Sequence, residues 1–139
     1  MLEIIKKIFI KTIRKTPEKK VLIIENRFHS LEFLNRVLSG KYLVLIAQDK
    51  DEALNRARAD KPDLIILNSR LNKERTLKLC ISLRNIDETK DTPILMIAEK
   101  GDDSNITEFY AQKIESYIFE PFTKKDILNQ LQVALNPRK

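Results

Sequence analysis

The sequence predicts an α/β protein built on a doubly wound parallel sheet. Five short apolar runs alternate with five segments whose apolar residues recur at helical spacing. The runs are mostly unbroken, which is typical of parallel strands covered by helices on both faces. The chain has 139 residues, of which 42% are hydrophobic and 33% charged, and this suits one compact domain with a core. Together these observations predict five βα units.

The first two units are expected between residues 21 and 60. Residues 21–24 form a strand-length apolar run, and Ser30 is predicted to cap a helix that ends near Ser39. Residues 42–46 are the second predicted strand. A capping-box pattern opens the next helix at Asp49. The residues expected to face the core from these two helices are Leu31, Leu34, Val37 and Leu38, then Ala53, Leu54 and Ala57.

Three further units complete the pattern, with predicted strands at residues 64–67, 94–97 and 117–119. A helix through residues 77–83 follows the first of them, and a weaker helix through residues 101–110 follows the second. Thr123 is expected to cap the last helix, whose inward residues are Ile127, Leu128, Leu131, Ala134 and Leu135.

Composition excludes several kinds of site. The only cysteine, Cys80, cannot form an internal disulfide or a cysteine-based zinc site, and its spacing predicts a small buried hydrophobe. Two glycines cannot supply a glycine-rich phosphate loop. No acid–base pair with an obvious role is present, so no enzyme activity and no cofactor are expected. The cysteine content is typical of a cytoplasmic protein.

Residues 1–19 are predicted to be a basic amphipathic helical arm on a domain formed by residues 20–139. Residues 1–20 carry seven basic and two acidic side chains, a charge of +5, whereas the whole chain carries +6. One helical face of the arm includes Leu2, Ile5, Ile8, Phe9 and Ile13. The arm has three possible roles. It could pack its apolar face on protein, which would be a second copy of the chain or its own domain. It could instead lie on an anionic membrane surface, or contact the phosphates of nucleic acid.

Polar residues follow four of the predicted strands, at the carboxyl ends where open α/β sheets bind ligands. These residues are Glu25-Asn26, Asn68-Ser69-Arg70, Ala98-Glu99-Lys100 and Glu120-Pro121. Any functional site of the domain is therefore expected at this edge of the sheet.

From residue 20 to about residue 136 the chain resembles the CheY-like receiver domain of response regulators. The resemblance rests on Lys-Pro-Asp-Leu-Ile-Ile-Leu at 61–67, the segment 77–84, Thr-Pro-Ile at 92–94, and Tyr-Ile-Phe-Glu-Pro-Phe at 117–122. It implies a flavodoxin-like fold with parallel strand order 2-1-3-4-5. It also implies protein partners in two-component signalling, which in this family often bind the face formed by the fourth helix, fifth strand and fifth helix.

The resemblance further implies a phosphorylation pocket, and this sequence departs from it. Receivers carry an acid pair that helps hold Mg²⁺, an aspartate nucleophile, a hydroxyl and a lysine. The matching positions hold Glu25-Asn26, Asn68, Ala98 and Glu120. The aromatic switch position is kept as Tyr117, which is expected to be fixed and partly buried. A carboxamide is a poor nucleophile, and Glu120 reverses a charge. The chain is therefore predicted to be a pseudo-receiver.

A cation on a side chain is expected to serve Glu25 and Glu120 in place of a metal, and Arg27, Arg70 and Lys100 are the candidates. The predicted function is phosphorylation-independent signalling through protein contact, with self-association through the arm as one route. The alternative is an adaptor that the basic arm tethers to a membrane or to nucleic acid.

Overall fold

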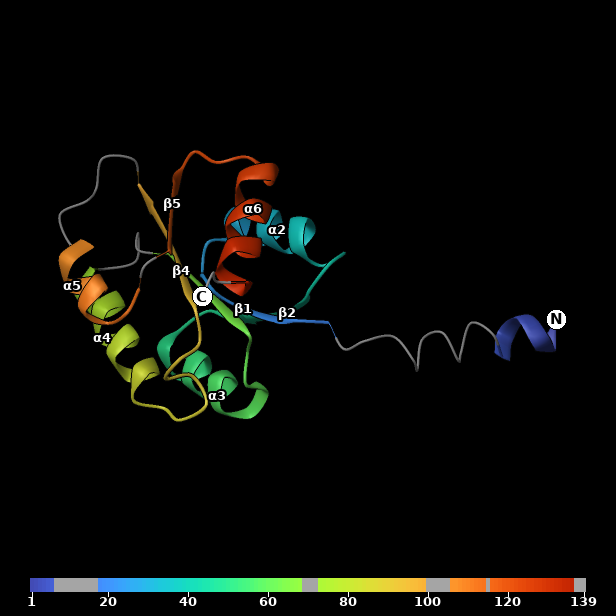
Figure 1. The fold of residues 1–139 in the computed structure, drawn as a ribbon, viewed down its shortest axis with the longest axis horizontal. Helices are drawn as coiled ribbons and strands as arrows, with labels where there is room; N and C mark the ends of the chain where they lie inside the picture. The colour runs from blue at the N-terminus through green and yellow to red at the C-terminus, as the bar shows by residue number, and fades with distance from the viewer. Residues whose placement is uncertain (7–17, 69–72, 100–105, 115, 137–139) are drawn as a thin grey trace.

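A parallel five-stranded sheet forms the centre of the computed structural model, which describes residues 1–6, 18–68, 73–99, 106–114 and 116–136. The strands are β1 (Lys20–Ile24), β2 (Leu43–Ala47), β3 (Leu64–Asn68), β4 (Ile94–Glu99) and β5 (Ser116–Glu120). Their order in the sheet is β2-β1-β3-β4-β5, and every pair of neighbours is parallel. The predicted fold class and strand order are confirmed (Figure 1).

Helices cover both faces of the sheet (Figure 1). They are α2 (Phe28–Leu38), α3 (Lys50–Asp60), α4 (Lys73–Arg84), α5 (Ile106–Ala111) and α6 (Lys124–Leu135). Helices α2 and α6 lie on one face, and α3, α4 and α5 lie on the other (Figure 1). Because every strand is parallel to its neighbours, each helix carries the chain back to the edge where the strands begin. The carboxyl ends of all five strands therefore lie at the opposite edge of the sheet.

Alternation along the strands divides the core into two clusters. Val21 and Ile23 pack with α2 and α6, whereas Leu22 and Ile24 pack with α3 and α4. Neighbouring side chains of a strand point to opposite faces, and both faces are covered, so all four residues of the run 21–24 are buried. The inward residues predicted for α2, α3 and α6 belong to these clusters or pack against them.

Local capping explains two helix starts and corrects a third. Asp49 and Thr123 cap their helices, as predicted. The Asp49 side chain accepts from the Glu52 N–H at 2.8 Å, which is one half of the predicted capping box, and Thr123 forms a complete capping box with Asp126. The prediction that Ser30 caps its helix is wrong. Helix α2 begins at Phe28, because the Arg27 carbonyl already accepts the Leu31 N–H at 3.0 Å.

Cys80 is fully buried in α4, as its spacing predicts. Burial, which outweighs the nearby positive charge of Arg84, raises the pKa of its thiol to about 12. A thiol with this pKa forms almost no thiolate at neutral pH, so Cys80 acts here as a core residue.

A helical turn covers residues 2–6, with the Ile5 N–H donating to the Met1 carbonyl at 3.1 Å. Leu2 and Ile5 are 70% and 59% exposed, so these two apolar side chains of the predicted arm do not pack on the described domain. Three others, Ile8, Phe9 and Ile13, lie outside the described residues. Among the helices that the structure describes, none is both long and apolar enough to cross a bilayer.

Candidate functional site

Arg27 links carboxylates from opposite parts of the sheet edge. Its Nε donates to Glu25 Oε1 at 2.7 Å, and its backbone N–H donates to the same oxygen at 3.2 Å. Its Nη2 donates to Glu120 Oε1 at 3.3 Å. Glu25 directly follows β1 and Glu120 ends β5, two strands that β3 and β4 separate. The bridge therefore spans the edge from β1 across β3 and β4 to β5.

Burial makes this bridge electrostatically important. The Glu25 side chain is 1% exposed, whereas those of Arg27 and Glu120 are 36% and 22% exposed. A buried carboxylate is costly unless it is paired and hydrogen-bonded. Burial by itself lowers the pKa of Arg27, but the hydrogen bond and charge of Glu25, with Glu120, raise it above its ordinary value. The guanidinium therefore stays charged between the two acids.

Asn68 and Ala98 lie at the ends of the two strands between these acids. Asn68 is the last residue of β3, is buried, and pairs with Ile97 in the sheet. It lines a cavity of about 440 Å³ together with Glu120 and Phe122. Ala98 is buried in β4 and supplies only a methyl group. The cavity, which His29 and Ser30 also line, therefore offers a carboxamide and a carboxylate beside an imidazole and a hydroxyl, but no nucleophilic carboxylate at the end of β3.

Tyr117 is half-buried on the face of the sheet that carries α4. Its ring stacks on Phe119, with centroids 6.5 Å apart, and Met96 is its partner across the ladder. Its hydroxyl is buried and has no hydrogen-bond partner among the described residues. Burial first, and then the charge of Cys80, raise the pKa of this hydroxyl to about 12. The tyrosine thus presents an apolar ring and a neutral hydroxyl to the core.

The structure brings together part of the predicted pocket. Glu25 and Glu120 share Arg27, and Asn68 and Glu120 line one cavity. Asn26 is exposed and lines a separate cavity of about 450 Å³. Arg70 falls outside the described residues, as do Ser69 and Lys100. Within the described ranges, no three His, Cys, Asp or Glu side chains are grouped so that they could hold a metal ion.

Arg27 was one of three cations that the sequence offered for the two acids, and it binds both of them. The other two, Arg70 and Lys100, lie outside the described residues. A local signal favoured it, because a residue two positions after Glu25 can contact that carboxylate with both its backbone and its side chain. His29 is exposed and lies in the first turn of α2.

Comparison with known proteins places residues 21–132 in one family model, that of the response regulator receiver domain. The transcriptional regulatory protein ResD of Bacillus subtilis is 26% identical over 122 residues, which are 87% of this chain and 50% of ResD. The alkaline phosphatase synthesis transcriptional regulatory protein PhoP of the same organism is 29% identical over 119 residues, 84% of this chain and 48% of PhoP. The chain thus spans about half the length of these relatives.

The fold is also similar to that of a solved chemotaxis protein. The chemotaxis protein CheY4 of Vibrio cholerae superposes with a TM-score of 0.78 at 25% identity, covering 85% of this chain and 99% of that one.

Proposed function

The chain belongs to the response regulator receiver domain family, and from that premise we propose that it is a receiver that signals without taking up a phosphoryl group. Receiver domains are modules of two-component signalling. In this one, the proposed output is contact with a protein partner that does not depend on phosphorylation.

Two features carry the proposal together: the carboxamide of Asn68 at the end of β3, and the bridge that Arg27 makes between Glu25 and Glu120. Phosphoryl transfer to a receiver needs a carboxylate nucleophile, and the carboxamide of Asn68 carries no charge and holds its lone pair in resonance. Acceptance of a phosphoryl group also needs cationic groups around the developing charge. Glu120 brings a negative charge to that region and already engages the guanidinium of Arg27.

The residues present do not fit the Mg²⁺ that the family implies. Mg²⁺ requires a near-octahedral set of oxygen ligands, including carboxylates that are free to coordinate it. Oε1 of Glu25 accepts two hydrogen bonds from Arg27, and Oε1 of Glu120 accepts a third. A metal ion that used these Oε1 atoms would have to displace the guanidinium. Glu25 Oε2 is buried without a hydrogen-bond partner among the described residues, but one carboxylate oxygen falls short of an octahedral set. We therefore assign the cationic role in this pocket to Arg27.

Exposure to acetyl phosphate with Mg²⁺ tests the proposal. We expect the intact mass of the folded protein to stay unchanged, and Mg²⁺ alone to leave the melting temperature unchanged. An active receiver treated in the same way serves as the control. A stable mass gain of one phosphoryl group on the folded chain would overturn the proposal, and a clear Mg²⁺-dependent rise in melting temperature would overturn the role given to Arg27.

The surface that binds partners in many receivers is available in this chain. Tyr110 of α5 is 63% exposed and Phe119 of β5 is 39% exposed, so aromatic side chains of the kind enriched in protein interfaces face outward there. These exposed aromatics support a protein partner on this face.

A tethered adaptor is the second candidate, and the exposed apolar side chains of Leu2 and Ile5 favour it. Next to the basic residues of the arm, such side chains suit an anionic membrane surface. Binding to anionic vesicles and to DNA, measured with and without residues 1–19, separates the two candidates, because only the adaptor binds either one through the arm.

A further inference from the structure

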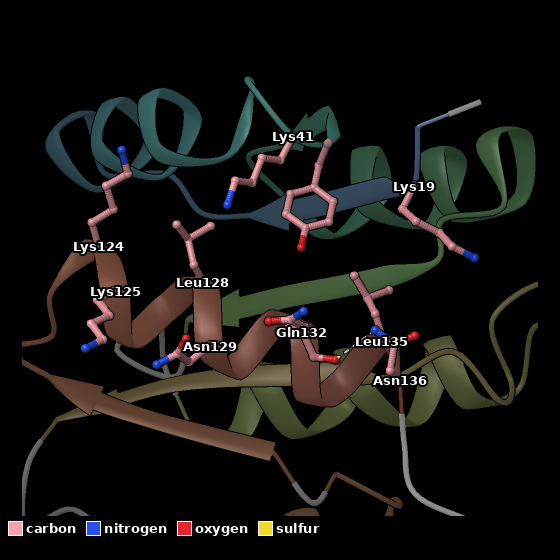
Figure 2. A pocket seen from close by; sticks show the side chains of 10 residues that line it. Lys19, Lys41, Lys124, Lys125, Leu128, Asn129, Gln132, Leu135 and Asn136 are labelled. Atoms are coloured by element: carbon pink, nitrogen blue, oxygen red, sulfur yellow. Dashed lines mark hydrogen bonds between the residues drawn. The ribbon is translucent and has the colours of Figure 1, made fainter. Parts of the chain in front are cut away.

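A basic groove runs along α6 on the face of the sheet that it shares with α2 (Figure 2). Its volume is about 640 Å³, and we call it the α6 groove. Four lysines line it: Lys19, Lys41, Lys124 and Lys125. Figure 2 shows Lys41 extending from the opposite wall toward Leu128, with Lys124 and Lys125 at the start of the helix and Lys19 near its end.

The charge of the groove has one sign. None of the ten described residues that line it carries a carboxylate. Two acids adjoin lining lysines in the sequence, the half-buried Glu18 beside Lys19 and Asp126 beside Lys125. Asp126 is engaged in the capping box, where it accepts from the Thr123 N–H at 2.9 Å. All four lysines are solvent-exposed. Because walls of one sign concentrate the potential in a concave surface, the groove attracts an anionic ligand.

The floor of the groove is partly apolar. Tyr42, Leu128 and Leu135 line it and are half-buried, since each packs against the core cluster of α2 and α6. Asn129, Gln132 and Asn136 add amide groups, each with donors and an acceptor, along the same helix. An occupant thus meets cations at the rim, amides along one wall and apolar surface at the bottom.

We propose that the α6 groove binds an extended acidic peptide segment of a partner protein. Helix α6 has 12 residues and is therefore about 18 Å long, which matches about five residues of extended chain at 3.3 Å each. Acidic side chains of such a segment pair with the lysines, its apolar side chains reach the floor, and its backbone groups pair with the amides.

Shape favours a peptide over other polyanions. A bilayer is a flat surface and cannot reach a recessed floor. A nucleic-acid duplex is recognised chiefly by cations that reach its phosphates, and the apolar floor adds nothing to that contact. The proposal goes beyond loss of phosphoryl transfer, because none of the groove residues belongs to the Glu25–Arg27–Glu120 bridge.

Fluorescence anisotropy with a labelled probe tests the proposal. The probe is an eight-residue peptide that alternates glutamate and leucine, and its counterpart has lysine in place of glutamate. We expect the intact chain to bind the first and not the second. The double variant Lys41→Glu/Lys124→Glu is expected to weaken binding about tenfold or more, since it turns two attractive contacts into repulsive ones.

A matched control is Lys78→Glu/Lys90→Glu, which replaces two exposed lysines outside the groove. Both double variants lower the formal charge from +6 to +2. We expect the control to change affinity less than twofold, and amide NMR shifts on peptide addition to map to residues 41–42 and 124–136. The proposal is wrong if both variants lose affinity equally, if the shifts map elsewhere, or if an oligonucleotide or phosphatidylserine vesicles bind the groove more tightly than the peptide does.

Discussion

Asn68 shows how one residue type constrains function. It ends β3 as a buried carboxamide at the position where the family resemblance places a nucleophilic carboxylate. Its neighbours at the sheet edge have changed too, since Ala98 supplies no hydroxyl and Glu120 is bound to Arg27. Compared with the phosphorylation pocket that the family resemblance implies, this pocket therefore differs in its charge pattern and not only in its nucleophile.

For this reason Asn68→Asp alone is expected not to restore phosphorylation by acetyl phosphate. A third carboxylate at a buried position near Glu25 and Glu120 should also lower the free energy of unfolding, by about 3 kcal/mol. Intact mass and chemical denaturation measure the two effects. Asn55→Asp makes the same exchange at an exposed position of α3 and should leave both unchanged. Phosphoryl uptake by the Asn68 variant would show that the pocket is less altered than proposed.

Tyr117 offers a second test at the residue scale. Its hydroxyl is buried without a hydrogen-bond partner among the described residues, and such a group costs free energy in the folded state. Tyr117→Phe keeps the ring and removes the oxygen, so it should raise the free energy of unfolding by about 1 kcal/mol. Thermal and urea denaturation measure the change. Tyr110→Phe, at an exposed site, is the control and should be neutral. A destabilised Tyr117 variant would mean that the hydroxyl has a partner that matters.

At the scale of elements, the helix starts differ in whether a side chain caps them. Helix α6 has a complete capping box, in which the Asp126 N–H donates to Thr123 Oγ1 at 3.1 Å and Asp126 accepts in return. Helix α2 has no side-chain cap at Arg27, whose side chain is engaged by Glu25 and Glu120. The start of α6 is thus stabilised locally, whereas the start of α2 is coupled to the candidate site.

Thr123→Ala is therefore expected to cost about 1 kcal/mol of stability, and Thr123→Ser to cost little. The hydrogen bonds from the backbone and hydroxyl of Thr123, followed by the charge of Lys125, lower the pKa of Asp126. A carboxyl with a depressed folded-state pKa stabilises the protein above its unfolded pKa of about 4 and loses this effect as pH falls through its folded pKa. The difference in free energy of unfolding between wild type and Thr123→Ala, measured by urea denaturation, should accordingly become smaller below about pH 4. A gap that stays constant at lower pH would show that Asp126 contributes nothing to the cap.

At the scale of the whole molecule, charge and apolar exposure are unevenly distributed. Residues 1–20 hold +5 of the total +6, and Leu2 and Ile5 expose most of their surface there. An exposed apolar stripe beside basic residues favours assembly or attachment to a surface. The arm and the α6 groove are basic features of different kinds, one a linear segment and the other a surface made by folding.

Removal of residues 1–19 should convert a self-associated chain to a monomer, with at least a twofold drop in mass by light scattering. The same truncation should leave vesicle and DNA binding negligible, as in the intact chain. The double variant Leu2→Asn/Ile5→Asn keeps the charge of the arm and should reproduce the truncation if apolar contact drives assembly. Anionic vesicle or DNA binding that disappears with the arm would favour the tethered adaptor instead.

Most of the fold could be predicted from the sequence, because the buried residues of each strand and helix recur at a regular spacing. The strand cores and the inward faces of α2, α3 and α6 follow from spacing alone, since each residue's burial depends on the geometry of its own strand or helix. The absence of a carboxylate at position 68 is likewise a fact of residue identity. The start of α2 was missed because it depends on Arg27, whose engagement is not a periodic signal.

Only the tertiary structure decided which groups meet. Arg27 joins Glu25 to Glu120, 93 residues further along the chain than Arg27, because the carboxyl ends of β1 and β5 lie along one edge of the sheet. The α6 groove likewise combines Lys19, Lys41 and residues of α6 that no local pattern connects. The sequence by itself determined the fold and the residue types at the candidate pocket, because both follow from the residues of short, separate segments. Contacts between distant segments were decided by the packing of the sheet and its helices, since such contacts depend on the relative positions of whole elements.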